Sequence, residues 1–195
     1  MSHHPILDSW NDHVAPSSPC SVEDMHQRIA RFGEIPASQR AFADTYLPGH
    51  ERTLYSVIGL GVTDDPHFKP KIAAAEHFHV DYITAPVGCG AAMHHHDSEE
   101  VFVVQSGQWE VSWIDGTDGR QHTTVLNEKD TISVPPFVHR SFKSLDGQGL
   151  LISILGGKKP GRVKWHEGVA QRAKSVGVGF DEHGGAIQLP TLNPT

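Results

Sequence analysis

The sequence predicts an all-β fold, a barrel or sandwich of short strands with partly helical extensions at both ends. The first observation is a series of short runs between residues 78 and 155 in which apolar and polar residues alternate, as in half-buried strands. The second is a set of turn residues between those runs, such as Ser106-Gly107 and Asp146-Gly147. The third is size. The 195 residues, 37% of them hydrophobic and 20% charged, suit one folded domain with terminal extensions.

The expected strands are short and regularly spaced, as in barrels and sandwiches. In the first one, Phe78, Val80 and Tyr82 alternate with more polar neighbours. The expected strands cover residues 78–83, 100–105, 109–114, 123–126, 131–134, 140–144 and 150–155.

Helical patterns occur outside this region. Ser21 stands three residues before Asp24, as in a capping box, and the helix it starts is expected to end at Gly33. Further short helices are expected over about 37–46 and 169–176, and residues 50–71 read as a connection. We therefore divide the chain into a mobile arm (1–20), a partly helical extension (21–74), the barrel (75–157) and a C-terminal extension (158–195).

Composition excludes several classes of protein. Sixteen Lys and Arg against 23 Asp and Glu leave a net charge of −7, which argues against a nucleic-acid-binding face. No apolar run approaches the roughly 18 residues of a membrane span, and the N-terminus lacks the pattern of a signal peptide. The two cysteines cannot form a disulfide framework. We expect a soluble cytoplasmic protein that binds neither nucleic acid nor membrane.

Fifteen histidines invite a search for metal-ligand spacing, and one segment has it. The pattern runs from Gly88 through His94, His96 and Glu100 to Gly107. Residues two apart in a strand share a face, so His94 and His96 are expected to point inward and His95 outward. Glu100 can add a carboxylate from the next strand, and Gly107 allows a tight turn. Two imidazoles and a carboxylate on a concave surface suit a divalent transition metal.

A fourth ligand is sought downstream. Asp130 is followed by Pro135-Pro136 and then by His139, and the two prolines provide a rigid entry into the next strand. On that strand His139 can face the same interior.

These two stretches resemble the motifs of the cupin superfamily, and the resemblance covers about residues 75–157. The first motif agrees at every position. The second departs from the usual pattern, because Asp130 and Val138 stand where glycines are common and the gap from proline to histidine is shorter. The resemblance implies a jelly-roll-like cupin β-barrel with a three-histidine, one-glutamate metal set: His94, His96, Glu100 and His139. Small cupins commonly dimerise, so a homodimer is expected as well.

The resemblance implies one divalent transition metal per chain, with iron as the first expectation and manganese, nickel, cobalt, zinc or copper as alternatives. The leading hypothesis is a metal-dependent dioxygenase acting on a small organic or aromatic substrate. A metal-dependent lyase or isomerase, and a non-catalytic small-molecule-binding barrel, remain open. Catalytic residues cannot be assigned.

The residues expected to line either a pocket or plain core are Phe102, Val104, Trp109, Val111 and Trp113, and Cys89 is expected to be a small buried residue.

Overall fold

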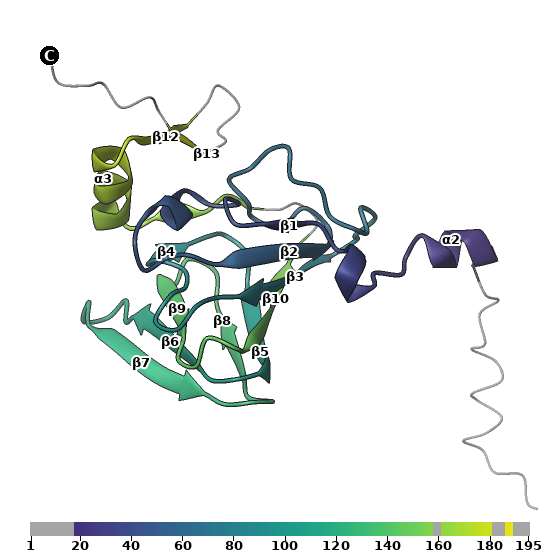
Figure 1. The fold of residues 1–195 in the computed structure, drawn as a ribbon. Coiled ribbons are helices and arrows are strands. Elements are labelled where there is room, and N and C mark those ends of the chain that lie inside the picture. Colours follow the sequence, from purple (N-terminus) through teal and green to yellow (C-terminus); the bar gives the residue numbers. More distant parts are fainter. Residues whose placement is uncertain (1–17, 158–160, 181–185, 189–195) are drawn as a thin grey trace, which may run out of the picture.

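Two antiparallel sheets face each other in the computed structural model, which describes residues 18–157, 161–180 and 186–188 (Figure 1). The six-stranded sheet has the order β1-β2-β3-β10-β5-β8 and the five-stranded sheet the order β11-β4-β9-β6-β7. The strands of the first sheet are β1 (Ala37–Ser38), β2 (Thr53–Ile58), β3 (Phe78–Thr84), β10 (Leu150–Gly156), β5 (Glu100–Ser106) and β8 (Thr131–Val134). Those of the second are β11 (Lys164–Trp165), β4 (His94–His95), β9 (Arg140–Ser144), β6 (Trp109–Ile114) and β7 (Gln121–Leu126). The all-β prediction is confirmed.

The core lies between the two sheets. Strand alternation turns Phe102, Val104 and Leu151 of the six-stranded sheet toward Trp109 and Val111 of the five-stranded sheet, and all five are fully buried. Burial of large apolar side chains is the main favourable term in folding, so this layer holds the sheets together. Of the residues expected to line a pocket or core, Trp113 differs, because its ring stacks on His122 at 5.7 Å.

The hairpin between β5 and β6 shows why the turn signals were informative. Gly107 has a φ of +78°, a left-handed conformation that glycine adopts without strain. A Cβ at this position would lie 2.5 Å from the Cα of Gly149. The turn therefore requires glycine, both for its conformation and for this close approach.

The sheets extend beyond residues 75–157. The stretch expected as a connection contains β2, whose apolar run pairs with β3, and β1 pairs with β2 through Ala37↔Tyr55. The expected helix over 37–46 is replaced by β1 and the 3₁₀ helix η2 (Ala43–Tyr46), because sheet pairing and burial outweigh local helical spacing there. The C-terminal extension adds β11, the helix α3 (Glu167–Ser175) and the hairpin β12 (Val178–Phe180) with β13 (Ala186–Gln188).

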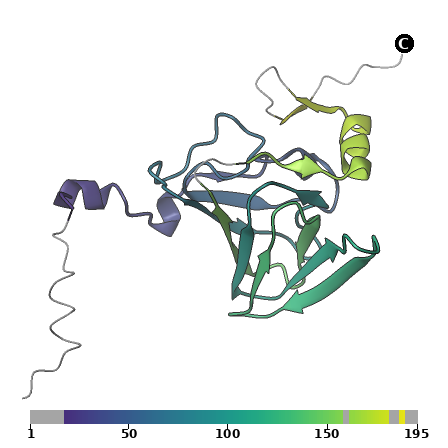
Figure 2. The ribbon, with the colours of Figure 1, turned by 180° about the vertical axis from the view of Figure 1, so that it is seen from behind.

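The N-terminal helix α2 (Val22–His26) begins with the predicted capping box, in which Ser21 and Asp24 bond each other's backbone N–H groups. The chain then passes through the 3₁₀ helix η1 (Phe32–Glu34) into the barrel. Both ribbon views show α2 projecting from the barrel (Figures 1 and 2), and all of its residues are exposed. Most of the predicted mobile arm, residues 1–17, lies outside the described residues.

In the part of the chain that the structure describes, no helix combines the length and apolar character needed to cross a membrane.

Candidate metal centre

The first predicted motif forms a buried polar group inside the barrel. His94 on β4 is 6% exposed, His96 just after it is 1% exposed, and Glu100 at the start of β5 is 5% exposed. The intervening His95 points the other way, as alternation along an extended segment requires. Possible ligand atoms of His94, His96 and Glu100 all lie within 4.8 Å of one another. These three residues could therefore bind a metal ion.

Each imidazole is oriented by a backbone carbonyl. His94 Nδ1 lies 2.7 Å from the oxygen of Ala92, and His96 Nδ1 lies 2.9 Å from the oxygen of Ser98. A carbonyl only accepts, so the contact with Ala92 puts the proton of His94 on Nδ1 and leaves its Nε2 atom as a possible metal ligand. His96 Nδ1 also lies near Ser98 Oγ and Arg140 Nη2, and its Nε2 atom faces the Glu100 carboxylate. Histidines that ligate metals are held in this way. The local chain thus holds both rings in place.

Glu100 is the carboxylate of the group, as predicted, whereas its neighbour Glu99 is exposed and accepts a hydrogen bond from Ser133. Ser153 on β10 donates to Glu100 Oε1 over 2.6 Å. The second oxygen, Oε2, lies 3.1 Å from His96 Nε2. One carboxylate oxygen is therefore fixed by the sheet and the other faces the histidines.

The predicted fourth ligand, His139, is not part of this group, and Arg140 takes the inward position. Arg140 is the Cα partner of His94 between β9 and β4 and is fully buried. Its Nη2 atom contacts Glu100 Oε2 at 3.1 Å and also contacts His96 Nε2. Alternation explains the correction: Phe142, two residues after Arg140, belongs to the core, so Arg140 shares its face and His139 does not.

His139 instead belongs to a second set of histidines outside the barrel. Its ring centroid lies 4.7 Å from that of His95 and 5.7 Å from that of His166. Burial, and then the neighbouring His95, lowers the pKa of His139 below its ordinary value. We call His95, His139 and His166 the outer histidines.

The electrostatics of the interior keep two members of the group ready as donors. Burial, and then the positive charge of Arg140, lowers the pKa of His94 to about 3, so this imidazole is neutral at neutral pH. Burial alone would raise the pKa of Glu100, but the contact with His96 and the charge of Arg140 outweigh it and lower that pKa to about 2. The interior thus contains a carboxylate and a neutral imidazole, with a guanidinium beside them.

Sequence reasoning missed Asp81, a further carboxyl group in the interior. Asp81 on β3 is 4% exposed, and its Oδ1 atom is buried with no hydrogen-bond partner among the described residues. Its Cα partner on β10 is Ser153, which bonds Glu100. Burial, reinforced by the charge of Glu100, raises the pKa of Asp81 to about 7. The available signal was an acidic residue at an inward position of the predicted strand 78–83.

A small cavity of about 30 Å³ adjoins these groups, and Asp81, His94, Glu100 and Ser153 are among its lining residues. That volume is enough for about one or two water molecules. Trp165 of β11 also lines the cavity, its ring 5.4 Å from that of His94, and its Nε1–H donates to Asp64 over 3.3 Å. The C-terminal extension therefore forms part of the cavity wall.

Cys89 does not join the polar group. Its thiol is half-buried against the core and donates to Glu51 over 3.3 Å. Burial and the adjacent Glu51 carboxylate raise the pKa of this thiol, which keeps it protonated.

Comparison with known proteins gives matches to solved structures only, since no protein-family model and no curated protein matches the chain. An RmlC-like cupin from Shewanella frigidimarina aligns over 66% of this chain and 89% of its own, with 17% identity and a TM-score of 0.46. KdgF from Halomonas aligns over 57% of this chain and 83% of its own, with 15% identity and a TM-score of 0.41. A mutant of the Bacillus subtilis oxalate decarboxylase OxdC aligns over 74% of this chain and 38% of its own, with 12% identity and a TM-score of 0.49.

Two facing antiparallel sheets, with the His94, His96 and Glu100 side chains between them, complete the pattern expected from the first motif. The chain has the cupin fold. The similarity to the solved cupin structures concerns the fold alone.

The donor set inside this barrel fits a divalent transition metal. Two imidazoles held by backbone carbonyls and one carboxylate are ligands that such ions favour. The Arg140 guanidinium contacts two of these three donor residues, so it supplies positive charge where a cation would bind. Metal binding therefore requires the Nη2 group to move aside.

Proposed function

We propose that this cupin is a metal-dependent dioxygenase that acts on a small organic or aromatic substrate and uses iron. The observation that carries the proposal is the buried group of His94, His96 and Glu100, two imidazoles and one carboxylate on neighbouring strands. Two histidines and a carboxylate with open positions are typical of non-haem iron oxygenases. A bound transition metal would supply Lewis acidity and one-electron chemistry at this site.

The chain's own residues would orient the reactants. Ala92 and Ser98 hold the two rings, and Ser153 holds Glu100, so the donors need little rearrangement. Arg140 keeps a fixed positive charge beside them, which suits a substrate with a carboxylate or phenolate group. The cavity of about 30 Å³ is too small for an aromatic ring, so lining side chains such as Trp165 would have to move to admit one.

Oxygen uptake tests this proposal. The protein is loaded anaerobically with Fe(II), mixed with catechol, gentisate or a diketone, and followed with an oxygen electrode. We expect uptake that requires both iron and one of these substrates and that His96→Ala abolishes. His139→Ala, the matched change on the outer surface, is expected to retain uptake. Absence of uptake with every substrate and every divalent metal would rule out the dioxygenase.

Asp81 favours a second candidate, a metal-dependent lyase or isomerase. A carboxyl group with a pKa of about 7 beside the cavity is suited to accepting and donating a proton at neutral pH. Such an enzyme would convert its substrate under anaerobic conditions, and Asp81→Asn would abolish turnover while leaving the metal content unchanged. Turnover that stops without oxygen would exclude this class.

A further inference from the structure

Strand β3 places polar side chains inside the barrel and apolar side chains on its outer face. His79 and Asp81 point inward and are each 4% exposed, whereas Val80 and Tyr82, which alternate with them, are partly exposed. A half-buried strand normally has the reverse arrangement, with its apolar residues on the buried face. Two consecutive inward positions held by a histidine and an aspartate therefore indicate a role other than packing.

These two side chains contain three buried polar atoms that make no hydrogen bond within the described part of the chain. The atoms are both ring nitrogens of His79 and Oδ1 of Asp81. Buried nitrogen and oxygen atoms are nearly always bonded, either to protein or to water. Because residues two apart on a strand share a face, the two Cα atoms lie about 6.8 Å apart and the side chains are neighbours. One water molecule can bridge side chains at this separation.

On one side, Asp81 continues into the metal centre through a row of buried polar residues. Ser56 of β2 and Ser153 of β10 are its Cα partners on either side. Ser153 donates to Glu100 Oε1 over 2.6 Å, and Asp81 and Glu100 both line the cavity of about 30 Å³. A serine hydroxyl accepts a hydrogen bond while it donates another. Groups that can pass on a proton therefore extend from Asp81 to the cavity.

On the other side, His79 and Asp81 lie directly beneath the bend that follows β2. A Cβ at Gly59 would collide with His79 Nδ1, and a Cβ at Gly61 would lie 2.6 Å from Asp81 Oδ2. Both glycines have positive φ, +70° and +57°, which glycine adopts without strain. Leu60 between them is 45% exposed. The wall between the two polar side chains and the surface is therefore only one backbone thick at this bend.

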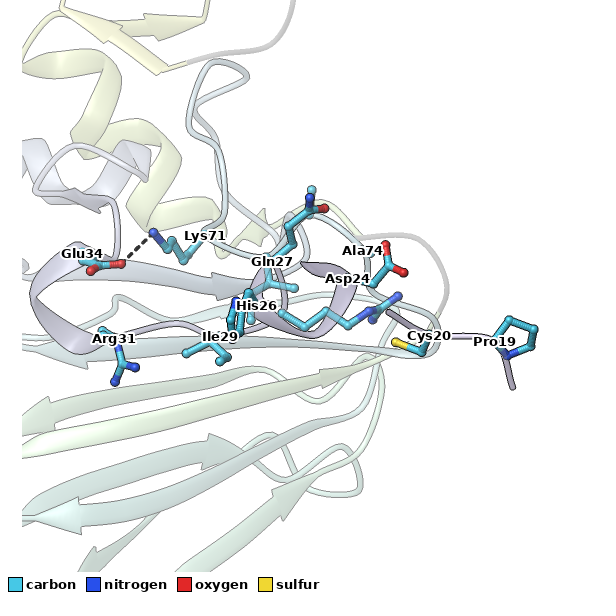
Figure 3. Close-up of a pocket in the computed structure, with 13 residues that line it drawn as sticks. Pro19, Cys20, Asp24, His26, Gln27, Ile29, Arg31, Glu34, Lys71 and Ala74 are labelled. Carbon is cyan, nitrogen blue, oxygen red and sulfur yellow. Dashed lines mark hydrogen bonds and ion pairs between the residues drawn. The ribbon is translucent and has the colours of Figure 1, made fainter. Parts of the chain in front are cut away.

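A surface groove lies next to the same bend. The Gly59 N–H donates to the carbonyl of Ile72 over 2.9 Å, which ties the bend to residues 71–74. Those residues line one side of a groove of about 990 Å³, and residues between Pro19 and Glu34 line the other, as Figure 3 shows. The histidine beneath Gly59 is thus placed between the surface and the interior.

We propose that His79 and Asp81 relay protons between the surface at Gly59 and the cavity beside Glu100. In the inward direction, one nitrogen of His79 takes up a proton from water and the other releases one. A bridging water passes that proton to one carboxyl oxygen of Asp81, and the other oxygen releases a proton to Ser153. The serine passes its own proton to an acceptor in the cavity. Each member gains one proton and loses one, so only N–H and O–H bonds form and break.

The electrostatics of the two residues suit this role. Burial lowers the pKa of His79, an effect that the backbone of Gly157 only partly offsets, and a neutral imidazole both accepts and donates. Burial raises the pKa of Asp81 to about 7, so this carboxyl group can gain and lose a proton at neutral pH. The relay is a property of the metal-free chain, so a failed oxygen-uptake assay would leave it standing.

Hydrogen–deuterium exchange at the Asp81 carboxyl group tests the relay. Its infrared C=O stretch shifts when deuterium replaces the proton, and the band that is missing in Asp81→Asn identifies it. At about pH 5, below a pKa of about 7, Asp81 is protonated. On transfer of the metal-free chain into D₂O, we expect His79→Ala to exchange at least 10-fold more slowly than the wild type. His122→Ala, which removes an exposed histidine from β7, is expected to match the wild type.

Chemical rescue separates proton transfer from packing. Free imidazole fits the space that the ring leaves in His79→Ala, and we expect it to restore the exchange rate to within threefold of the wild type. Pyrrole has the same ring size but does not take up a proton at this pH, so it is expected to leave exchange slow. Equal exchange in His79→Ala and the wild type would overturn the proposal, and so would the same response to imidazole and pyrrole.

The wild type alone provides a test if His79→Ala fails to fold. Exchange that requires opening of the sheet accelerates in sub-denaturing urea, because urea favours open states. Exchange of the Asp81 proton through the relay is expected to change less than twofold under the same conditions. A several-fold acceleration in urea would overturn the proposal, as would a wild-type spectrum without a protonated carboxyl band that Asp81→Asn removes.

Discussion

The inner and outer histidines lie a few residues apart in the sequence but in different surroundings. His94 and His96 are at most 6% exposed, and each places Nδ1 on a backbone carbonyl. The outer histidines contact one another ring to ring, and His95 Nδ1 has no hydrogen-bond partner among the described residues. Only the inner pair lies beside a carboxylate with fixed geometry. Burial and orientation, more than the presence of imidazoles, distinguish a group that could bind a metal from a cluster of rings.

The largest expected effect comes from breaking the inner group at Arg140. Arg140→Met would leave the Glu100 carboxylate buried beside His96 without its cation, and loss of one partner of a buried ion pair typically costs about 3–5 kcal/mol. We expect this loss in the free energy of unfolding of the metal-free protein, measured by urea denaturation. Saturating Co²⁺ is expected to recover much of it, because a metal replaces the missing charge. An equal loss with and without Co²⁺ would contradict this interpretation.

The raised pKa of Asp81 predicts that the free energy of unfolding depends on pH, and this effect is expected to be of intermediate size. Its pKa is about 7 in the folded protein and about 3.9 in an unfolded chain, so the folded state holds the extra proton between these values. Stability should therefore fall as pH rises from 4 to 7. Asp81→Asn is expected to be more stable than the wild type at pH 8 by on the order of 2–4 kcal/mol, at about 1.4 kcal/mol per pKa unit. At pH 4 the two should be equal.

The pKa shift of Glu100 has the opposite sign to that of Asp81. Its effect on the pH dependence of stability therefore serves as an internal control. Its pKa is lowered to about 2, so its contribution to stability is present above its unfolded value and is lost as pH falls toward 2. Urea denaturation from pH 3 to pH 8 separates the two carboxyl groups. If Asp81→Asn and the wild type had parallel pH profiles, Asp81 would not carry the raised pKa.

The smallest change in stability is expected from substitution of the outer histidines. His139→Ala removes a partly exposed ring that packs on the rings of His95 and His166, and such surface changes usually alter stability by less than about 0.5 kcal/mol. Thermal unfolding of the metal-free variant measures this. A loss above about 2 kcal/mol would show that the outer ring cluster is a structural element of the barrel.

Much of this architecture could be predicted from the sequence because it depends on short-range patterns. Alternation predicted the strands, and the spacing of His94, His96 and Glu100 predicted the inward group. The second motif misled because family spacing favoured His139, whereas alternation from Phe142 assigns the inward face to Arg140. The role of β2, and of Trp165 at the cavity, depends on contacts between residues far apart in sequence, which periodicity does not report.

Metal binding tests the central claim most directly, that the inner residues hold the ion and the outer ones do not. Equilibrium dialysis against Co²⁺, with metal analysis of the dialysed protein, is compared for the wild type, His96→Ala and His139→Ala. We expect one ion per wild-type chain, at least a 100-fold weaker affinity in His96→Ala, and a change of less than threefold in His139→Ala. Loss of Co²⁺ binding in His139→Ala, or equal Co²⁺ binding by His96→Ala and the wild type, would contradict this claim.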